Sequence, residues 1–302
     1  MNVTKRRERF RAVLAGDKCI YPAPVFDAIS ARIAEDLGFE IGFLAEPAAE
    51  ATVLGSPNFH AVLLTSSELA QQAHRICRAS SISLEVEAYG GFGNALNVMR
   101  TVEDLEDSGV SAITIEDTVM PLGFRSSEEM QFRLTVDPLV SLEEGIGKMK
   151  AALAARQDPS LVIIGRTRAL HLPTGGIPEA IRRVKAYEKV GVDAINLSGL
   201  GSQEQLEALH AETKLPFICG SWLAHSDKRH VDKGFLAAHG LRMEQPGHLS
   251  LFAAMKAQYD ILKALRDGAD PAELRSMQAS PELQAQVLRK AQYNEWIKTF
   301  LS

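Results

Sequence analysis

The chain has 302 residues, of which 46% are hydrophobic, and a formal net charge of −5. This length suits one large α/β barrel or two ordinary domains, and the apolar content is sufficient for a packed core. The charge gives no basic footprint for nucleic acid, and no apolar run approaches the ~20 residues of a membrane span. The three cysteines, Cys19, Cys77 and Cys219, are far apart, which fits reduced cytoplasmic thiols better than a disulfide framework.

Short apolar runs alternate with amphipathic helical patterns along most of the chain. The expected strands are 23–25, 41–45, 82–86, 112–115, 161–165, 194–197, 217–219 and 241–244. Between them, helical patterns cover 28–37, 66–79, 97–107, 142–156, 177–190 and 203–212. Eight strands separated by helices predict a parallel sheet, and eight such units close into a (β/α)8 barrel. Since no low-complexity linker interrupts the pattern, we expect one barrel domain over residues 1–302.

The C-terminal segment departs from this alternation. Residues 248–265 predict one long helix, 268–271 break it, and 272–301 are helical again. Residues 269–302 are therefore expected to form a helical extension of the barrel. Further helices after a completed barrel need a surface to cover, which is either their own barrel or a neighbouring subunit.

Polar residues follow many of the predicted strands. In a barrel of this type the active site lies at the C-terminal ends of the strands. That rule nominates Asp27, Glu46, Glu87, Glu116, Arg166, Ser198, Ser221 and the loop 244–248. Glu87 and Glu116 end consecutive strands beside the glycine-rich loop 90–94, an arrangement that suits a divalent metal or a small anionic substrate. A polar residue at a strand end can equally be a cap or a turn former.

Five motifs occur in order along the chain. They are residues 25–32 (VFDAISAR), 90–94 (GGFGN), 115–117 (IED), 164–167 (IGRT) and 247–248 (GH). Together they resemble the isocitrate lyase/phosphoenolpyruvate mutase superfamily, most closely its oxaloacetate decarboxylase branch. The resemblance implies a barrel whose terminal helices are exchanged between neighbours, in a homo-oligomer built as a dimer of dimers. It also implies a lyase that breaks a carbon–carbon bond of a small 2-oxo or dicarboxylic acid through a stabilised enolate.

The resemblance further implies roles for particular residues. In the family, Mg²⁺ chelated by a 2-oxo acid takes up the developing enolate charge, and here Glu87 and Glu116 are its implied ligands. Arg166 is implied to bind the substrate, because a guanidinium fork matches a carboxylate and does not titrate. The implied catalytic residues are Arg166, Glu116 and Tyr89, and the implied substrate-binding residues are Pro47, Gly91, Arg166 and His248.

Several motif positions differ from the family pattern. Tyr89 and Asn58 stand where aspartates are expected, and Pro47 stands for a substrate-contacting serine. Mg²⁺ is therefore expected to bind weakly, to depend on the ligand, or to be absent. Arg168 replaces a short polar or acidic residue, and we expect its side chain to point outward into solvent. An inward Arg168 would partly replace the charge of the metal.

The loop that follows the fourth strand, residues 117–131, contains no cysteine. The thiol acid of isocitrate and methylisocitrate lyases is therefore absent, which argues against those activities. The loop is long and polar, as expected of a lid. Two alternatives to a metal-dependent lyase stay open. One is a metal-independent enzyme in which Tyr89 donates a proton and arginines replace the cation, and the other is a non-catalytic carboxylate-binding paralogue.

Overall fold

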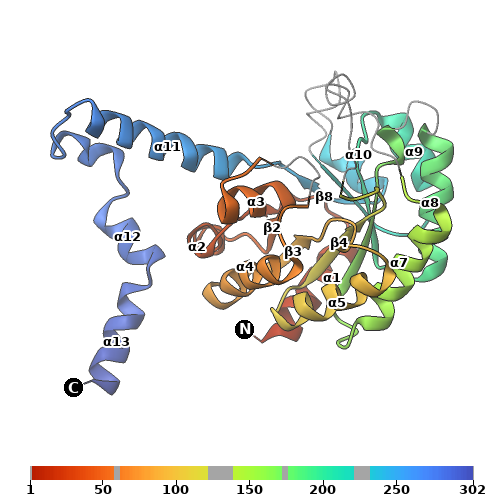
Figure 1. Ribbon diagram of the computed structural model, residues 1–302, viewed down its shortest axis with the longest axis horizontal. Helices are drawn as coiled ribbons and strands as arrows, with labels where there is room; N and C mark the ends of the chain where they lie inside the picture. The colour runs from red at the N-terminus through yellow and green to blue at the C-terminus, as the bar shows by residue number, and fades with distance from the viewer. Residues whose placement is uncertain (1, 58–61, 122–138, 172–175, 221–231, 302) are drawn as a thin grey trace.

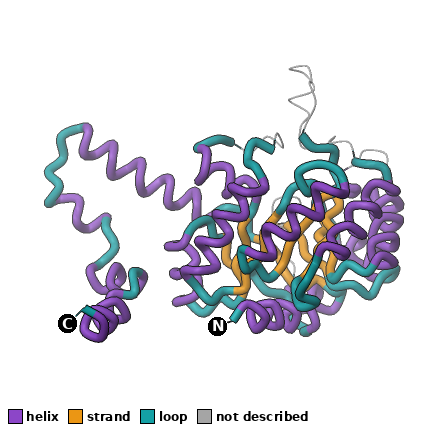
Figure 2. The backbone as a smooth tube through the Cα atoms, turned by 60° about the horizontal axis from the view of Figure 1, so that its bottom comes forward, coloured by secondary structure: helices purple, strands orange, loops and turns teal. Residues whose placement is uncertain are grey.

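The computed structural model describes residues 2–57, 62–121, 139–171, 176–220 and 232–301. Eight parallel strands run in chain order from β1 to β8, with helices packed around them (Figures 1 and 2). A parallel bridge between Ile20 and Met243 joins the two ends of the sheet. The predicted (β/α)8 barrel is therefore confirmed.

All eight predicted strands are present, and their ends differ from the prediction by no more than two residues. The strands are β1 (Ala23–Pro24), β2 (Ile41–Leu44), β3 (Ser83–Glu87), β4 (Ala112–Glu116), β5 (Val162–Thr167), β6 (Ala194–Leu197), β7 (Phe217–Gly220) and β8 (Leu241–Gln245). The helices around them are α1 (Val3–Ala15), α2 (Ala28–Asp36), α3 (Glu46–Leu54), α4 (Ser66–Ala79), α5 (Ala95–Asp107), α7 (Leu142–Ala155), η1 (Ala169–His171), α8 (Gly176–Val190), α9 (Gln203–His210) and α10 (Lys233–Ala238).

Helix α1 closes the N-terminal end of the barrel. Its Phe10 and Leu14 pack on inward-facing apolar side chains: Ile41, Ala112, Val162, Ile164, Ala194, Ile218 and Met243. Because strand side chains alternate between the two faces of a sheet, the next inward positions toward the carboxyl ends are two residues further on. Four of these positions are polar, Thr114, Arg166, Asn196 and Gln245, and Phe43 on β2 is apolar. Glu85 on β3 hydrogen-bonds to Thr114 and Gln245 at the same level. The interior is thus apolar at the end closed by α1 and polar at the other, where the site lies.

Helix α4 illustrates how the outer layer is specified. Thr65 Oγ1 accepts from the Glu68 N–H, and Glu68 Oε2 accepts from the Thr65 N–H, which forms a capping box. Leu69, Ala73 and Ile76 follow at helical spacing and are fully buried against the barrel. None of the helices that the structure describes is long and apolar enough to cross a bilayer.

The C-terminal helices leave the barrel. Helix α11 (Leu249–Arg266) projects away from it, and the chain then turns through η3 (Glu273–Met277), α12 (Pro281–Val287) and α13 (Lys290–Phe300) (Figures 1 and 2). The sequence predicted one helical stretch over 272–301, whereas the structure divides it. Ser280 is extended before Pro281, because the proline ring disfavours helical geometry in the preceding residue. Arg289 interrupts the segment a second time with a φ of 58°.

Candidate functional site

A cavity of about 330 Å³ opens at the carboxyl ends of the strands. It brings together six residues that the sequence nominated, Glu46, Pro47, Glu87, Arg166, Ser198 and His248. The volume lies near the lower end of the roughly 300–1,000 Å³ that is usual for small-molecule sites. The cavity therefore suits a small ligand.

Arg166 joins the two carboxylates at the ends of β3 and β4. Its Nη1 contacts Glu87 Oε1, and its Nε lies 2.9 Å from Glu116 Oε2. Burial by itself lowers the pKa of Arg166, but the charges of Glu87 and Glu116 outweigh burial and raise the pKa above its usual value. The guanidinium therefore stays charged at any physiological pH.

Arg168 points into the barrel mouth, so the expected outward orientation is wrong. Its side chain lines the cavity, the residue is only 7% exposed, and its Nε lies 3.8 Å from Glu116 Oε1. The pairing of the chain after β4 with β5 continues past Glu116. Asp117 N–H donates to Arg166 O at 3.1 Å, and Arg168 N–H donates to Asp117 Oδ1 at 3.2 Å. The alternation of faces therefore persists to residue 168, which directs Arg168 to the same side as Arg166.

The second acid of the IED motif has a structural position. Asp117 is fully buried, and its Oδ2 accepts hydrogen bonds from Arg183 Nη1 and Tyr187 Oη, each at 3.1 Å. Both partners belong to α8, so Asp117 ties this helix to the end of β4. Glu116 is the acid of the motif that contacts Arg166, although it is not among the described residues that line the cavity. Thr118 Oγ1 donates to its Oε1 at 2.5 Å.

Glu46 begins α3 and lies beside Glu87. Its backbone N–H donates to Glu87 Oε2 at 3.3 Å, and its side chain lines the cavity. Within the described chain the Glu46 carboxylate accepts no hydrogen bond and forms no ion pair. Burial, and then the charges of Glu87 and Glu116, raise its pKa well above the usual value for a glutamate.

Tyr89, just before the glycine-rich loop, and Gly91 within it lie behind the wall of the cavity. Tyr89 is fully buried, has a φ of 51°, and donates from Oη to Glu50 Oε1 at 2.8 Å. Gly91 has a φ of 80°, and a Cβ there would lie 2.3 Å from Val98 Cγ2, so β3 and α5 approach closely at this point. Neither residue is among those that line the cavity in the described chain.

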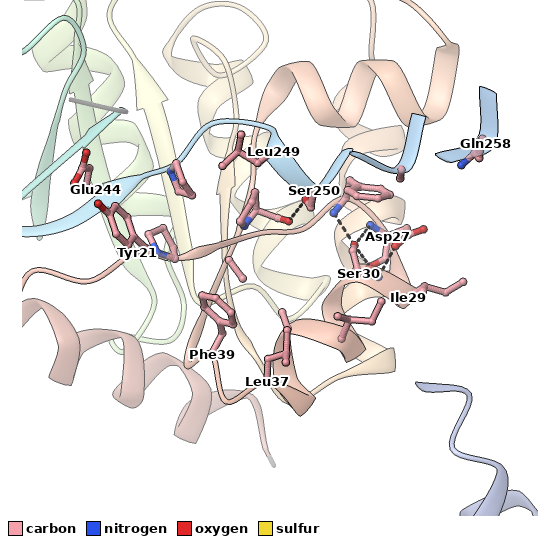
Figure 3. Close-up of a pocket in the computed structure, with 18 residues that line it drawn as sticks. Tyr21, Asp27, Ile29, Ser30, Leu37, Phe39, Glu244, Leu249, Ser250 and Gln258 are labelled. Atoms are coloured by element: carbon pink, nitrogen blue, oxygen red, sulfur yellow. Dashed lines mark hydrogen bonds between the residues drawn. The ribbon is translucent and has the colours of Figure 1, made fainter. Parts of the chain in front are cut away.

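Other nominated residues lie away from the cavity. Asp27 caps α2 by accepting the Ser30 N–H at 2.7 Å, and with Glu244 it borders a separate apolar groove outside the barrel (Figure 3). His248, unlike Asp27 and Glu244, lines the cavity, and burial lowers the pKa of its imidazole. Asn58, Ser221 and most of the 117–131 loop lie outside the described residues.

Sequence reasoning missed a polar layer beneath the cavity. Glu85 is fully buried and accepts from Thr114 Oγ1 at 2.8 Å and from Gln245 Nε2 at 3.1 Å, and burial raises its pKa to about 7. Asn196 Nδ2 in turn donates to Gln245 Oε1 at 3.3 Å. The signal for Glu85 was its spacing, because an acid two residues before Glu87 in a strand must face the same way.

The donor set can be compared with the needs of a divalent cation. In the described chain, no three histidine, cysteine, aspartate or glutamate side chains converge on one point, and Arg166 bridges Glu87 and Glu116. The chemistry nevertheless fits Mg²⁺, because the available donors are hard carboxylate oxygens and the Glu46 carboxylate beside them has no partner within the described residues.

Known proteins match the chain over nearly its whole length. The phosphoenolpyruvate phosphomutase family model matches residues 10–266. An oxaloacetate decarboxylase of Bradyrhizobium sp. (strain BTAi1) is 44% identical over 301 residues, which cover 100% of this chain and 99% of that protein. Phosphonopyruvate hydrolase in complex with oxalate and Mg²⁺ has a TM-score of 0.82 at 26% identity, with 100% of both chains covered. Oxaloacetate acetylhydrolase with the product oxalate has a TM-score of 0.78 at 26% identity, with 97% of both chains covered. The chain therefore belongs to the phosphoenolpyruvate phosphomutase family, within the isocitrate lyase/phosphoenolpyruvate mutase superfamily.

Proposed function

We propose that this chain is a carbon–carbon lyase that converts oxaloacetate into pyruvate and carbon dioxide. The observation that carries the proposal is Arg166, a permanently charged guanidinium that lines a small cavity at the barrel mouth. The 44% identity to an oxaloacetate decarboxylase along the entire chain supports the same reaction.

Arg166 is suited to the anionic parts of the reaction. We assign to it the carboxylate next to the 2-oxo group, for which its planar fork is complementary. In the reaction the C3–C4 bond breaks, its electron pair enters the enolate, C4 leaves as carbon dioxide, and C3 then takes up one proton. A fixed guanidinium stabilises the enolate because it needs no reorganisation as the charge develops. The apolar part of the cavity wall, which we assign to the exclusion of water around the departing carboxylate, consists of Phe43, Pro47 and Leu200.

We assign the divalent cation, Mg²⁺, to Glu87 and Glu116. When bound, the cation supplies Lewis-acid polarisation of the 2-oxo group. Both carboxylates contact Arg166, so a cation has to compete with the guanidinium for them. A substrate carboxylate draws Arg166 away and relieves this competition. Mg²⁺ should therefore bind weakly alone and more tightly together with a 2-oxo acid or oxalate.

The remaining predicted residues fall into two groups. Pro47 and His248 line the cavity and are assigned to the substrate wall. Tyr89 and Gly91 are assigned supporting roles, because Tyr89 holds Glu50 on α3 and Gly91 permits the close packing of β3 and α5. Glu50 and Glu46 stand on the same helix, so Tyr89 positions that helix beside the cavity.

The test is a turnover assay that follows pyruvate formation from oxaloacetate, with Mg²⁺ and in excess chelator, beside calorimetric titration of Mg²⁺ with and without oxalate. Turnover that needs Mg²⁺, with Mg²⁺ affinity strengthened by oxalate, is the expected result. Full turnover in chelator would instead favour the metal-independent enzyme. Oxalate binding without turnover of oxaloacetate or related 2-oxo acids would contradict the proposal and favour a binding protein.

A further inference from the structure

Glu46 is an acid of the cavity wall to which none of the roles assigned above applies. It is the first residue of α3, directly after β2, and is 3% exposed. Its backbone N–H contacts Glu87 Oε2, so its side chain starts from a point adjacent to one of the two assigned cation ligands. The geometry therefore brings a third carboxylate to the wall that carries Glu87 and Arg166.

The carboxylate of Glu46 lacks the partners that buried acids usually have. Glu50, one turn further along α3, accepts on Oε1 from Tyr89 Oη at 2.8 Å and from Leu63 N–H at 3.0 Å, whereas its enclosed Oε2 has no partner within the described chain. No hydrogen bond or ion pair reaches the Glu46 carboxylate from any described residue, and its side chain makes no cap to α3. The Glu46 oxygens are not among the fully enclosed atoms that lack a partner, and Glu46 lines the cavity, so a ligand in the cavity can supply the partner that the described chain does not.

The neighbouring charges identify the kind of ligand. Glu87 and Glu116 act on Glu46 as repelling charges, in the same direction as burial, while Arg166 and Arg168 act on it as attracting charges. When Arg166 turns to a substrate carboxylate, its attraction for these acids is lost and the repulsion among them remains. A small cation at this wall would relieve that repulsion and satisfy the unpartnered oxygens at once, whereas an anion would add to the repulsion. Hard carboxylate oxygens are the preferred protein ligands of Mg²⁺ and Mn²⁺.

We propose that Glu46 is a third carboxylate of the divalent-cation site, which is completed with Glu87 and Glu116 when Arg166 turns from these acids to the substrate. This inference rests on the proposed function, because it needs a carboxylate ligand that draws Arg166 away. It also accounts for the lack of a converged three-ligand cluster in the described chain, where Arg166 still bridges Glu87 and Glu116.

The test is Mn²⁺ binding, read from the electron paramagnetic resonance signal of the free ion, with saturating oxalate and no turnover. Glu46→Gln keeps the size of the side chain and removes its charge, and should weaken Mn²⁺ binding by about 10- to 100-fold, the range seen when groups that hold or orient metal ligands are removed. Glu50→Gln is the matched control, since it removes a buried charge from the same helix whose oxygen is already held by Tyr89. Its effect on Mn²⁺ affinity should be far smaller.

Each outcome separates the two proposals. If wild-type protein binds Mn²⁺ with oxalate and Glu46→Gln binds it equally well, the role of Glu46 is wrong while the cation assignment stands. If Glu46→Gln keeps Mn²⁺ affinity but slows turnover, Glu46 acts on the substrate instead, which also overturns the ligand role. If the wild type binds no Mn²⁺ with oxalate, the cation itself is wrong, whatever its turnover. Circular dichroism checks folding of the variants, and Glu46→Asp, which keeps a carboxylate, should retain more affinity than Glu46→Gln.

Discussion

Two guanidinium groups face the same small cavity, and they differ in how they are held. Arg166 contacts two carboxylates, whereas Arg168 lies 3.8 Å from one oxygen of Glu116. A carboxylate ligand that enters the cavity replaces Glu87 and Glu116 as the partner of Arg166. The net gain is therefore a difference between two similar interactions, and it depends on the geometry of the fork more than on charge.

Arg166→Lys tests this dependence. Lysine keeps the positive charge and loses the planar fork, so oxalate binding should weaken by ~1–3 kcal/mol, the scale of a charge-assisted hydrogen bond. Isothermal titration with oxalate at constant Mg²⁺ measures the change. Arg182→Lys is a suitable control, because Arg182 pairs only with Glu179 on the exposed face of α8 among the contacts of the described chain. Equal oxalate affinity in Arg166→Lys and wild type would rule out the assigned role.

Glu85 gives a prediction for the pH dependence of stability. Burial raises its pKa from 4.5 to about 7, so between these values the folded chain keeps a proton that the unfolded chain has lost. The folded state then binds more protons than the unfolded state, and stability falls as pH rises. Glu85→Gln removes this contribution. Relative to wild type, the variant should gain about 3 kcal/mol of unfolding free energy as pH rises from 4.5 to 7.

Urea unfolding of both proteins at several pH values measures this difference. The Glu85→Gln substitution is not expected to disturb the local hydrogen bonds, because an amide oxygen can still accept from Thr114 and Gln245. A difference between the two proteins that stays constant over this pH range would show that Glu85 titrates as it does in the unfolded chain.

The residue scale also shows what the sequence can and cannot predict. Glu87, Glu116 and Arg166 were predictable, because polar residues at the carboxyl ends of barrel strands have little choice of position. The direction of Arg168 was not, because it depends on whether strand pairing persists past the last regular residue, and this depends on the Asp117 side chain. The lack of a described hydrogen-bond partner for the Glu46 carboxylate could not be predicted either, because it depends on the positions of groups that are distant in sequence.

At the scale of elements, the connection from β3 to α5 is closely packed at Gly91. Gly91 has a φ of 80°, and a Cβ there would overlap Val98 on the first turns of α5. Both the backbone strain and the overlap oppose any side chain. The glycine-rich motif therefore fixes the distance between the strand that carries Glu87 and the helix that follows it.

Gly91→Ala should destabilise the protein by about 1–3 kcal/mol or more, the scale of a strained backbone position. Gly147→Ala is the control, and it should change the stability in the opposite direction. Gly147 lies inside α7, and a Cβ there would meet no atom within 4 Å, so alanine should stabilise the helix by about 1 kcal/mol. Urea denaturation of the two variants measures both changes. A Gly91→Ala protein as stable as wild type would mean that the loop relaxes away from α5.

Periodicity explains why the elements were easier to predict than their arrangement at the C-terminus. Each strand is a short apolar run and α4 carries a strong apolar stripe, so burial of these residues requires the barrel. After residue 268 the helical pattern persists, but few of its apolar residues are buried in this chain. Without a surface to pack on, the pattern does not determine where one helix ends and the next begins, and local signals such as Pro281 divide the segment instead.

At the scale of the whole molecule, two apolar surfaces lack a cover within the described chain. One is a face of α11, on which Leu249, Phe252, Met255, Tyr259, Leu262 and Leu265 are exposed. The other is a groove of about 850 Å³ between the β1–α2 region and the start of α11, where Figure 3 shows Ile29, Leu37 and Phe39 along one side. Exposed apolar surfaces of this extent are typical of interfaces between proteins.

In the arm formed by α11, α12 and α13, helix α11 projects away from the barrel, as Figures 1 and 2 show. The arm returns to α2 near the end of α12. Arg289 pairs with Glu35 at 3.1 Å and with Asp36 at 2.8 Å, and Arg32 Nη1 donates to the carbonyl oxygen of the buried Val287 at 3.3 Å. Partly exposed ion pairs at the surface contribute little to stability. We therefore favour exchange of the C-terminal helices between subunits, as the family resemblance implies, over a fold-back onto the same barrel.

Removal of residues 269–302 tests this exchange. The shortened chain loses α12 and α13, and with them apolar side chains such as Trp296 and Phe300 that are exposed in one copy. If these helices pack on a neighbour, the shortened protein should elute from gel filtration with light-scattering detection as a smaller species or as aggregate. A second variant, Leu262→Glu, puts a charge into the apolar face of α11 and should dissociate the assembly without shortening the chain. Lys263→Gln, the next residue along the helix, is its control, because Lys263 pairs only with Asp267 among the described contacts. A shortened chain that stays a well-folded oligomer of unchanged order would contradict the exchange, since its terminal helices would then bear no part of the interface.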